Sequence, residues 1–210
     1  MAEAAKISEG EREALIDAVA AETVEMGYAN ISAERIVARA GLPGPSFDAV
    51  FPDLRTAVAT AHETLFERFA DRLVRACETQ SNWPLKVKVG IGLTLDLAAA
   101  SPVRAQFLLL ESAASDPKLA RQVLESRDRL VRLLATGRSE IPEAAGLPGV
   151  TEQALIGGLA GLISSQIVNG DAENLPSLAP ELVELTLLPY LGAEEATAVA
   201  RRPRPPIEGL

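Results

Sequence analysis

The chain has 210 residues, of which 48% are hydrophobic and 4% aromatic, and its net charge is −9. This length allows one or two domains with a sizeable core, and a core of aliphatic and alanine side chains is typical of an all-helical protein. The acidic charge excludes a general binder of nucleic acids or membrane surfaces but still allows one local basic face. Since no signal peptide and no apolar run of membrane-spanning length are found, we expect a cytoplasmic protein with no membrane partner.

The first predicted element is an amphipathic helix over residues 11–26 that ends at Gly27-Tyr28. Residues 32–51 then predict two short helices joined at a glycine, which is the arrangement of a helix-turn-helix. Ser32 is a suitable N-cap for the first of these helices, and Gly41 can end it in the left-handed conformation.

The second short helix is predicted to begin at Pro43 or Pro45, where a missing N–H costs little. Phe47 and Phe51 are four residues apart and can anchor this helix through one face. In a helix-turn-helix, the second helix is the one that enters the major groove of DNA. A long helix is predicted to begin directly afterwards, at Leu54.

The order of these features resembles the TetR family of bacterial transcriptional repressors. The features that carry the resemblance are Gly27-Tyr28, the Ser32 cap, Ile36-Val37, Ala40-Gly41-Leu42, the closing Phe51 and the long helix after it. They cover about residues 10–60, and the C-terminal segment Glu181–Gly192 is similar to the closing helix of many actinobacterial members. The resemblance implies an all-α fold of about nine helices. It further implies a three-helix DNA-binding domain at 1–52, a helical effector-binding and dimerisation domain at 53–200, and a flexible tail at 201–210.

The resemblance also implies that operator DNA is a partner and that the helix-turn-helix supplies the contacts to it. The corresponding positions here are Ser32, Arg35, Arg39, Gly44, Pro45, Ser46, Asp48, Ala49 and Arg55. Two positions depart from the family pattern, because Asp48 replaces a phosphate-binding tyrosine and Leu54 replaces a lysine. A carboxylate that faces phosphate is repulsive, so these departures weaken binding.

Charge leaves two interpretations of this domain open. Residues 1–60 hold five basic and ten acidic residues, a net charge of −5, whereas DNA-binding domains are usually basic. In the first interpretation the acids lie on the outer face of the first helix, and Arg35, Arg39 and Arg55 form a small basic patch that binds the operator. In the second, the chain is a repressor-like dimer whose DNA contacts are weak or lost.

After the long helix, breaks in helical periodicity delimit five more predicted helices, at 85–100, 103–114, 117–136, 151–169 and 180–191. The helix at 151–169 is rich in small residues, which is costly unless they let another helix approach closely. We therefore expect it to form a homodimer interface together with the last helix, through Gly158, Gly161, Leu162, Ser165, Leu182 and Leu185. The alternative is a tightly packed internal helix.

The resemblance places a small hydrophobic effector, of unknown identity, in the C-terminal domain. The candidate pocket residues are Phe66, Phe69, Trp83, Leu97, Phe107, Leu110 and Gln166, each of which ordinary core packing would also explain. His62 is the one histidine and Cys77 the one cysteine. A lone histidine cannot form a multi-histidine metal site, and a buried spectator thiol is favoured over a redox sensor.

We find no phosphate-binding loop, no nucleophile elbow and no convincing carboxylate pair, so we expect neither an enzyme nor a cofactor. The sequence therefore predicts a ligand-responsive DNA-binding transcriptional repressor that acts as a homodimer on a palindromic operator. The competing hypothesis is a TetR-like small-molecule-binding or protein-interaction dimer with weak or lost DNA binding.

Overall fold

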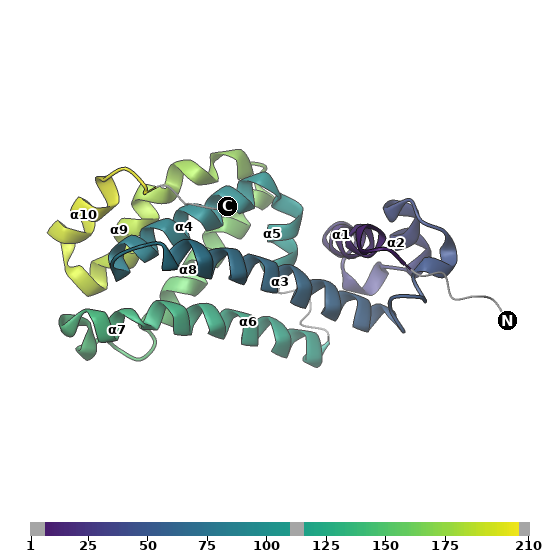
Figure 1. Ribbon diagram of the computed structural model, residues 1–210, viewed down its shortest axis with the longest axis horizontal. Coiled ribbons are helices and arrows are strands. Elements are labelled where there is room, and N and C mark those ends of the chain that lie inside the picture. Colours follow the sequence, from purple (N-terminus) through teal and green to yellow (C-terminus); the bar gives the residue numbers. More distant parts are fainter. Residues whose placement is uncertain (1–6, 110–115, 206–210) are drawn as a thin grey trace. The chain divides into compact units, whose positions relative to one another are not determined.

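The computed structural model describes residues 7–109 and 116–205, and over this part of the chain it is all-α with no strand, as predicted (Figure 1). The chain divides into two compact units: unit 1 comprises residues 1–67 and 103–124, and unit 2 comprises residues 68–102 and 125–210. Helices α3 (Leu54–Glu78) and α6 (Pro117–Ala135) both begin in unit 1 and end in unit 2. The predicted boundary between residues 52 and 53 separates a DNA-binding from an effector-binding domain. The structural division runs through α3 and α6 instead, so it does not test this functional boundary, which stays a prediction. No helix of the described ranges is long and apolar enough to cross a membrane.

Unit 1 begins with α1 (Glu9–Met26), which starts two residues earlier than the sequence predicts. The earlier start is explained by a capping box, in which the Ser8 hydroxyl accepts from the Glu11 amide and the Glu11 carboxylate accepts from the Ser8 amide. The helix ends at Gly27, whose φ of +74° lies in the region that favours glycine. A 3-10 helix, η1 (Tyr28–Asn30), follows.

The first helix of the helix-turn-helix is α2 (Ala33–Ala40), and both of its predicted ends are confirmed. The Ser32 side chain caps it by accepting from the Arg35 amide at 3.4 Å. Gly41 ends it in the left-handed conformation, with φ +69° and ψ +28°. Ile36 and Val37 are buried and fix the inner face of α2 against the unit 1 core.

The predicted second helix of the motif is wrong in its type. Residues 44–46 form a short 3-10 helix, η2 (Gly44–Ser46), and residues 47–50 continue as hydrogen-bonded turns. The reason is local: Pro45 has no N–H to donate, and the amides of Ser46 and Phe47 bond three residues back, to Pro43 and Gly44. The predicted aromatic anchor is confirmed, because Phe47 and Phe51 are both buried with ring centroids 5.4 Å apart. We call residues 44–50 the recognition segment.

Unit 1 is completed by the first part of α3, by α5 (Pro102–Leu109) and by the start of α6. Asp116 caps α6, as the Asp-Pro sequence predicts, since its Oδ1 accepts from the amides of Lys118 and Leu119 at 2.9 and 3.4 Å. Leu119 and Phe107 are buried in the same core as α1 and α2. The start of α6 is thus packed on the helix-turn-helix.

Unit 2 contains the predicted helices, extended or shortened by one to three residues, and four short elements that we did not predict. The predicted helices are α4 (Trp83–Ala100), α8 (Thr151–Val168) and α9 (Ala179–Leu191), besides the ends of α3 and α6. Short helical turns occupy segments predicted as loops, namely α7 (Gly137–Glu140), η4 (Pro142–Gly146) and η5 (Ala172–Leu178). The unpredicted α10 (Ala193–Arg201) follows α9 directly, because Gly192 at φ +76° reverses the chain between them.

The unit 2 core is built around Trp83, which is 2% exposed. Its ring lies 4.4 Å from that of Tyr190 on α9, measured between centroids. On its other side the chain comes so close that a Cβ on Gly137 would lie 2.4 Å from the indole, so a side chain at Gly137 would displace the tryptophan. Cys77 is buried in this unit as well, and burial raises the pKa of its thiol to about 11, which confirms the prediction of a buried thiol.

A buried carboxylate joins three segments of unit 2. Glu152, in the first turn of α8, accepts from Arg138 at 2.7 Å and from the Tyr190 hydroxyl at 2.7 Å. Arg138 also donates to the backbone carbonyls of Leu147 and Pro148. The hydrogen bond from Arg138 outweighs burial and lowers the pKa of Glu152 to about 2, so this carboxylate is charged at neutral pH. The network fixes the chain between α7 and α8.

A buried lysine of α4 caps the C-terminus of α10. Lys88 is 5% exposed, and its ammonium donates to the carbonyl oxygens of Val199 at 2.6 Å and Ala200 at 2.8 Å, and to that of Arg202. A cation at this end of a helix satisfies carbonyls that have no partner within the helix. Two residues further, Arg204 pairs with Asp96 at 2.6 Å. The described start of the predicted tail therefore makes specific contacts with α4.

We expect Lys88→Met to destabilise the protein by about 2 kcal/mol, because it leaves buried carbonyls of α10 without a charged donor. Urea unfolding measures this loss as a lower midpoint. Lys86→Met is the matched control on the same helix, since Lys86 makes a half-exposed pair with Glu140 at 3.2 Å. Exposed pairs contribute at most about 1 kcal/mol, so equal losses in the two variants would contradict the capping role of Lys88.

Candidate nucleic-acid interface

The recognition segment presents most of its predicted DNA contacts to solvent. Gly44, Pro45, Asp48 and Ala49 are exposed, so each of them could reach a neighbouring molecule. Ser46 is 8% exposed, which makes it the least accessible of the predicted contacts in this segment. Asp48 therefore contributes an exposed negative charge to the recognition segment.

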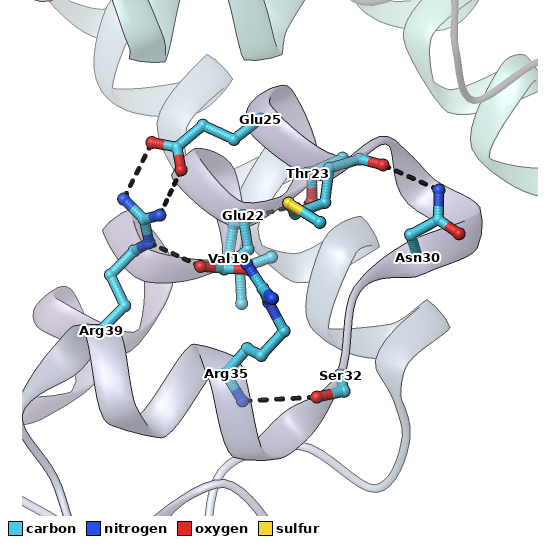
Figure 2. Close-up of polar contacts among 9 residues, drawn as sticks. Val19, Glu22, Thr23, Glu25, Asn30, Ser32, Arg35 and Arg39 are labelled. Carbon is cyan, nitrogen blue, oxygen red and sulfur yellow. Dashed lines mark hydrogen bonds and ion pairs between the residues drawn. The ribbon is translucent and has the colours of Figure 1, made fainter.

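Glu22 on α1 is buried, with 3% exposure, and binds two arginines of α2 (Figure 2). Its two carboxylate oxygens accept from Arg35 Nε and Arg39 Nε, each at 2.8 Å. The hydrogen bond from Arg35 lowers the pKa of Glu22, against the opposing effect of burial, and Arg39 adds to this. Arg39 also donates through Nη1 and Nη2 to the carboxylate of Glu25, at 2.9 Å for Nη1. Figure 2 shows the guanidinium of Arg39 held between the two glutamates.

This cluster corrects the expectation that the acids of the first helix lie on its outer face, because Glu22 is buried. Glu22 is inside the α1–α2 contact, and the side chains of Arg35 and Arg39 remain only 48% and 35% exposed. Two negative charges therefore offset the two positive charges of α2 at this position. The arginines are ordered and pre-positioned, but their charge is largely neutralised within the motif.

Arg55, the third predicted cation, is also paired. Its Nε lies 2.7 Å from Oδ2 of Asp116, and the Tyr28 hydroxyl donates to the same oxygen at 3.4 Å. The arginine side chain is 55% exposed, while that of Asp116 is 6% exposed. Each of the three arginines expected to form a small basic patch is thus held by a carboxylate of the same unit, and their role in binding the operator stays a prediction.

Sequence reasoning missed Glu22, Glu25, Tyr28 and Asp116 as partners of these arginines. One signal was available for the first of them: Glu22 falls at helical spacing from Ala18 and Val19, so a carboxylate occupies the apolar face of α1. Arg35 and Arg39 share one face of α2 because they are four residues apart. An acid on a buried face needs a cationic partner, and these two are the next cations along the chain after Glu22.

The predicted dimer residues of α8 are open in the structure. Gly158, Gly161 and Ser165 are exposed, Leu162 is half-buried, and a Cβ added at Gly158 or Gly161 would meet nothing within 4 Å. This argues against the alternative of a tightly packed internal helix. On α9, Leu185 is 55% exposed, whereas Leu182 is 4% exposed and packs inside the unit, so Leu182 is not available to a second molecule.

The predicted effector residues fall into both units. Phe66 and Phe107 are buried in unit 1 and flank His62, with ring centroids 6.3 and 6.1 Å from the imidazole. Trp83 is a core residue of unit 2, and its packing needs no ligand. Leu97 packs on Leu93, Phe69 and Gln166 are half-buried, and Leu110 lies outside the described residues.

His62 is 4% exposed, and neither ring nitrogen has a hydrogen-bond partner among the described residues. Burial lowers the pKa of His62, which the nearby backbone of Leu108 opposes only in part. No group of three or more metal-binding side chains occurs in the described ranges. The imidazole is therefore neutral at pH 7 and leaves its hydrogen-bonding capacity unused.

We expect the stability of the protein to fall as pH decreases below 6.5, because the unfolded chain then protonates His62 while the folded chain does not. His62→Leu should raise the free energy of unfolding at pH 7 by about 1 kcal/mol, since it removes an unpaired buried polar group. Urea unfolding at pH 7.5 and pH 5.5 compares the two proteins. His62 is the one histidine, so the difference between them isolates its titration. An identical pH dependence in both proteins would refute this explanation.

Over the described residues, the chain has a helix-turn-helix arrangement near its N-terminus, then a long helix and further helices, and this is the fold of solved TetR-like transcriptional regulators. Among solved structures, the chain is similar to the fatty acid degradation regulator FadR from Bacillus halodurans, with a TM-score of 0.75 and 19% identity over 87% of this chain and 97% of the other. It is also similar to FadR from Bacillus subtilis in complex with stearoyl-CoA, with a TM-score of 0.73 and 20% identity over 86% and 98%. A TetR-like transcriptional regulator from Rhodococcus sp. RHA1 follows, with a TM-score of 0.67 and 16% identity over 85% and 96%. No protein-family model matches the sequence, and a sequence search of curated proteins finds no match.

Proposed function

We propose that this protein is a ligand-responsive DNA-binding transcriptional regulator, and not an enzyme, that acts in the cytoplasm as a homodimer. It represses transcription from a palindromic operator. The observation that carries the proposal is the geometry of the helix-turn-helix. α2 is capped by Ser32 and ended by a left-handed Gly41, and the recognition segment is held by two buried phenylalanines with Asp48 and Ala49 facing solvent.

Dimerisation is supported by the open small-residue face of α8. Gly158, Gly161 and Ser165 would let a helix of a second copy approach closely, and Leu185 adds exposed apolar surface from α9. A dimer with two-fold symmetry presents its two recognition segments to two half-sites, which is why the operator is palindromic.

The proposed effector is a small hydrophobic molecule. One observation in its favour is His62, a buried polar group without a partner in the described ranges, between the predicted pocket residues Phe66 and Phe107. The structure of Bacillus subtilis FadR is a complex with stearoyl-CoA, whose long acyl chain is hydrophobic, and this supports an effector with a hydrophobic part. Effector binding would favour a conformation in which the two recognition segments no longer match the half-sites, and this would release the operator.

The proposal is tested by selection of duplexes from a random-sequence library with the purified protein. Fluorescence polarisation of the recovered duplex follows, at 50 to 200 mM NaCl. We expect an enriched palindromic sequence that binds at least about 1000-fold more tightly than random DNA, with an affinity that decreases as salt increases. Failure to enrich any sequence with a folded dimer would overturn the proposal.

The paired arginines and the exposed Asp48 specifically favour a second candidate, a TetR-like dimer that binds a small molecule or a protein with weak or lost DNA binding. This candidate predicts no enrichment in the selection. It also predicts that a compound such as stearoyl-CoA raises the melting temperature as its concentration increases, because it binds the native state.

A further inference from the structure

Asp116 occupies a position that links three parts of unit 1. Its Oδ1 caps α6 through the amides of Lys118 and Leu119, while its Oδ2 accepts from the guanidinium of Arg55 and from the hydroxyl of Tyr28. Arg55 lies in the first turn of α3 and Tyr28 directly after α1. One carboxylate therefore bonds to the start of α6, the start of α3 and the end of α1.

The two members of the Arg55–Asp116 pair differ in their freedom to move. Asp116 is 6% exposed and is fixed by two backbone amides of α6, whereas Arg55 is 55% exposed and is held only through its side chain, by the ion pair of its Nε with Asp116 and by an interaction with the Tyr28 side chain. A long, half-exposed arginine side chain can change rotamer at little cost. Arg55 is therefore the member that can leave the pair, and Asp116 is the member that moves only with α6.

We propose that Asp116 is a regulatory positioning residue that holds Arg55 in an ion pair which a DNA phosphate must displace, so that the position of the α6 N-terminus sets the affinity for DNA. This inference rests on the proposed function and adds to it the element that controls the phosphate contact. Phosphate neutralisation by arginine supplies much of the affinity of such proteins, and a cation already paired with a carboxylate contributes less of it.

The geometry makes this control sensitive to small movements. The Nε to Oδ2 distance is 2.7 Å, so a shift of about 1 Å between the starts of α3 and α6 takes it beyond the normal length of a hydrogen bond. Gln122 gives α6 a second bond to α3, from its amide nitrogen to the Ala59 carbonyl at 2.9 Å. Because α6 continues from unit 1 into unit 2, a ligand that repositions this helix would change the charge available at Arg55.

Asp116→Asn tests the proposal, since asparagine still caps a helix but carries no charge. The probe is a fluorescein-labelled 30-base-pair duplex of random sequence, because non-specific binding depends on phosphate contacts alone. We expect the variant to bind about threefold to tenfold more tightly at 50 mM NaCl. We also expect its log–log salt slope to be steeper by about one unit for each protomer.

Asp17→Asn is the matched control, because it removes the acid of another arginine–aspartate pair in unit 1, Arg104–Asp17 at 2.6 Å, and changes the net charge equally. The control should tighten binding much less, and adding Arg55→Gln to Asp116→Asn should abolish the gain.

Weaker binding by Asp116→Asn would mean that Asp116 orients Arg55 towards phosphate, and unchanged binding would mean that the pair does not regulate DNA binding. Either result overturns the regulatory role of Asp116. The proposed DNA-binding function still holds in both cases, provided that the wild-type protein binds the duplex. If none of the proteins binds DNA, both fail together, whereas binding by Asp116→Asn but not by wild type would support the regulatory role.

Discussion

Replacement of Gly161 by leucine is expected to convert the proposed dimer into a monomer at micromolar concentration. Gly161 is exposed on α8, and its missing side chain leaves open space that a helix of a second copy would fill. A leucine there would hold two closely packed backbones apart, and overpacking costs about 1 to 3 kcal/mol at each of the two symmetric positions. The total of about 2 to 6 kcal/mol corresponds to a dimer dissociation constant at least about 30-fold higher, which sedimentation or light scattering across a dilution series measures.

Gly10→Leu is the matched control for this prediction, because Gly10 is also a helical glycine with nothing within 4 Å of an added Cβ. It lies on α1, outside the proposed interface, and its variant should remain as dimeric as the wild type. Operator binding should be lost in Gly161→Leu with the dimer and kept in Gly10→Leu. An intact dimer in Gly161→Leu would exclude the small-residue face of α8 as the interface.

The features that could be predicted from the sequence are local ones. Ser32 caps α2, Gly41 ends it, Asp116 caps α6, and Phe47 packs against Phe51. Each of these depends on backbone conformation and on neighbours within four residues, so the residue types and their spacing contain the necessary information. The same holds for most helix boundaries, which the sequence placed within two or three residues.

The features that could not be predicted depend on partners distant in sequence. Lys88 caps α10 from 111 residues away, and Tyr190 reaches Glu152 across 38 residues. No pattern in the sequence pairs such residues, because the match depends on how helices pack. α10 itself was missed for a related reason, since Gly192 ends α9 and begins the next helix without a loop between them.

The ion pairs of the candidate interface also join residues that are distant in sequence, and they determine how much positive charge this surface offers to DNA. Counting residues gave the net charge of the domain but did not show that each of the three arginines has a carboxylate partner. The pairs Arg35–Glu22 and Arg39–Glu22 join residues 13 and 17 positions apart on two helices. Spacing within each helix was informative, but the contact between the helices was needed to show which charges cancel.

Reversal of the charge at Asp48 is expected to tighten DNA binding more than any other single change in the recognition segment. Asp48 is exposed there, while all three predicted cations of this surface are paired. Asp48→Lys removes a repulsive carboxylate and adds an unpaired cation in each protomer. We expect about tenfold tighter binding to a random 30-base-pair duplex at 50 mM NaCl and a salt slope steeper by about one unit per protomer.

Two variants show whether the position of the charge matters. Asp48→Asn removes the carboxylate without adding a cation and should give a smaller gain with a less altered slope. Glu194→Lys makes the same change of net charge at an exposed residue in the first turn of α10, in unit 2, and should have little effect. If Asp48→Lys and Glu194→Lys tighten binding equally, the affinity for DNA depends only on the net charge of the protein. The recognition segment is then not the surface that contacts DNA.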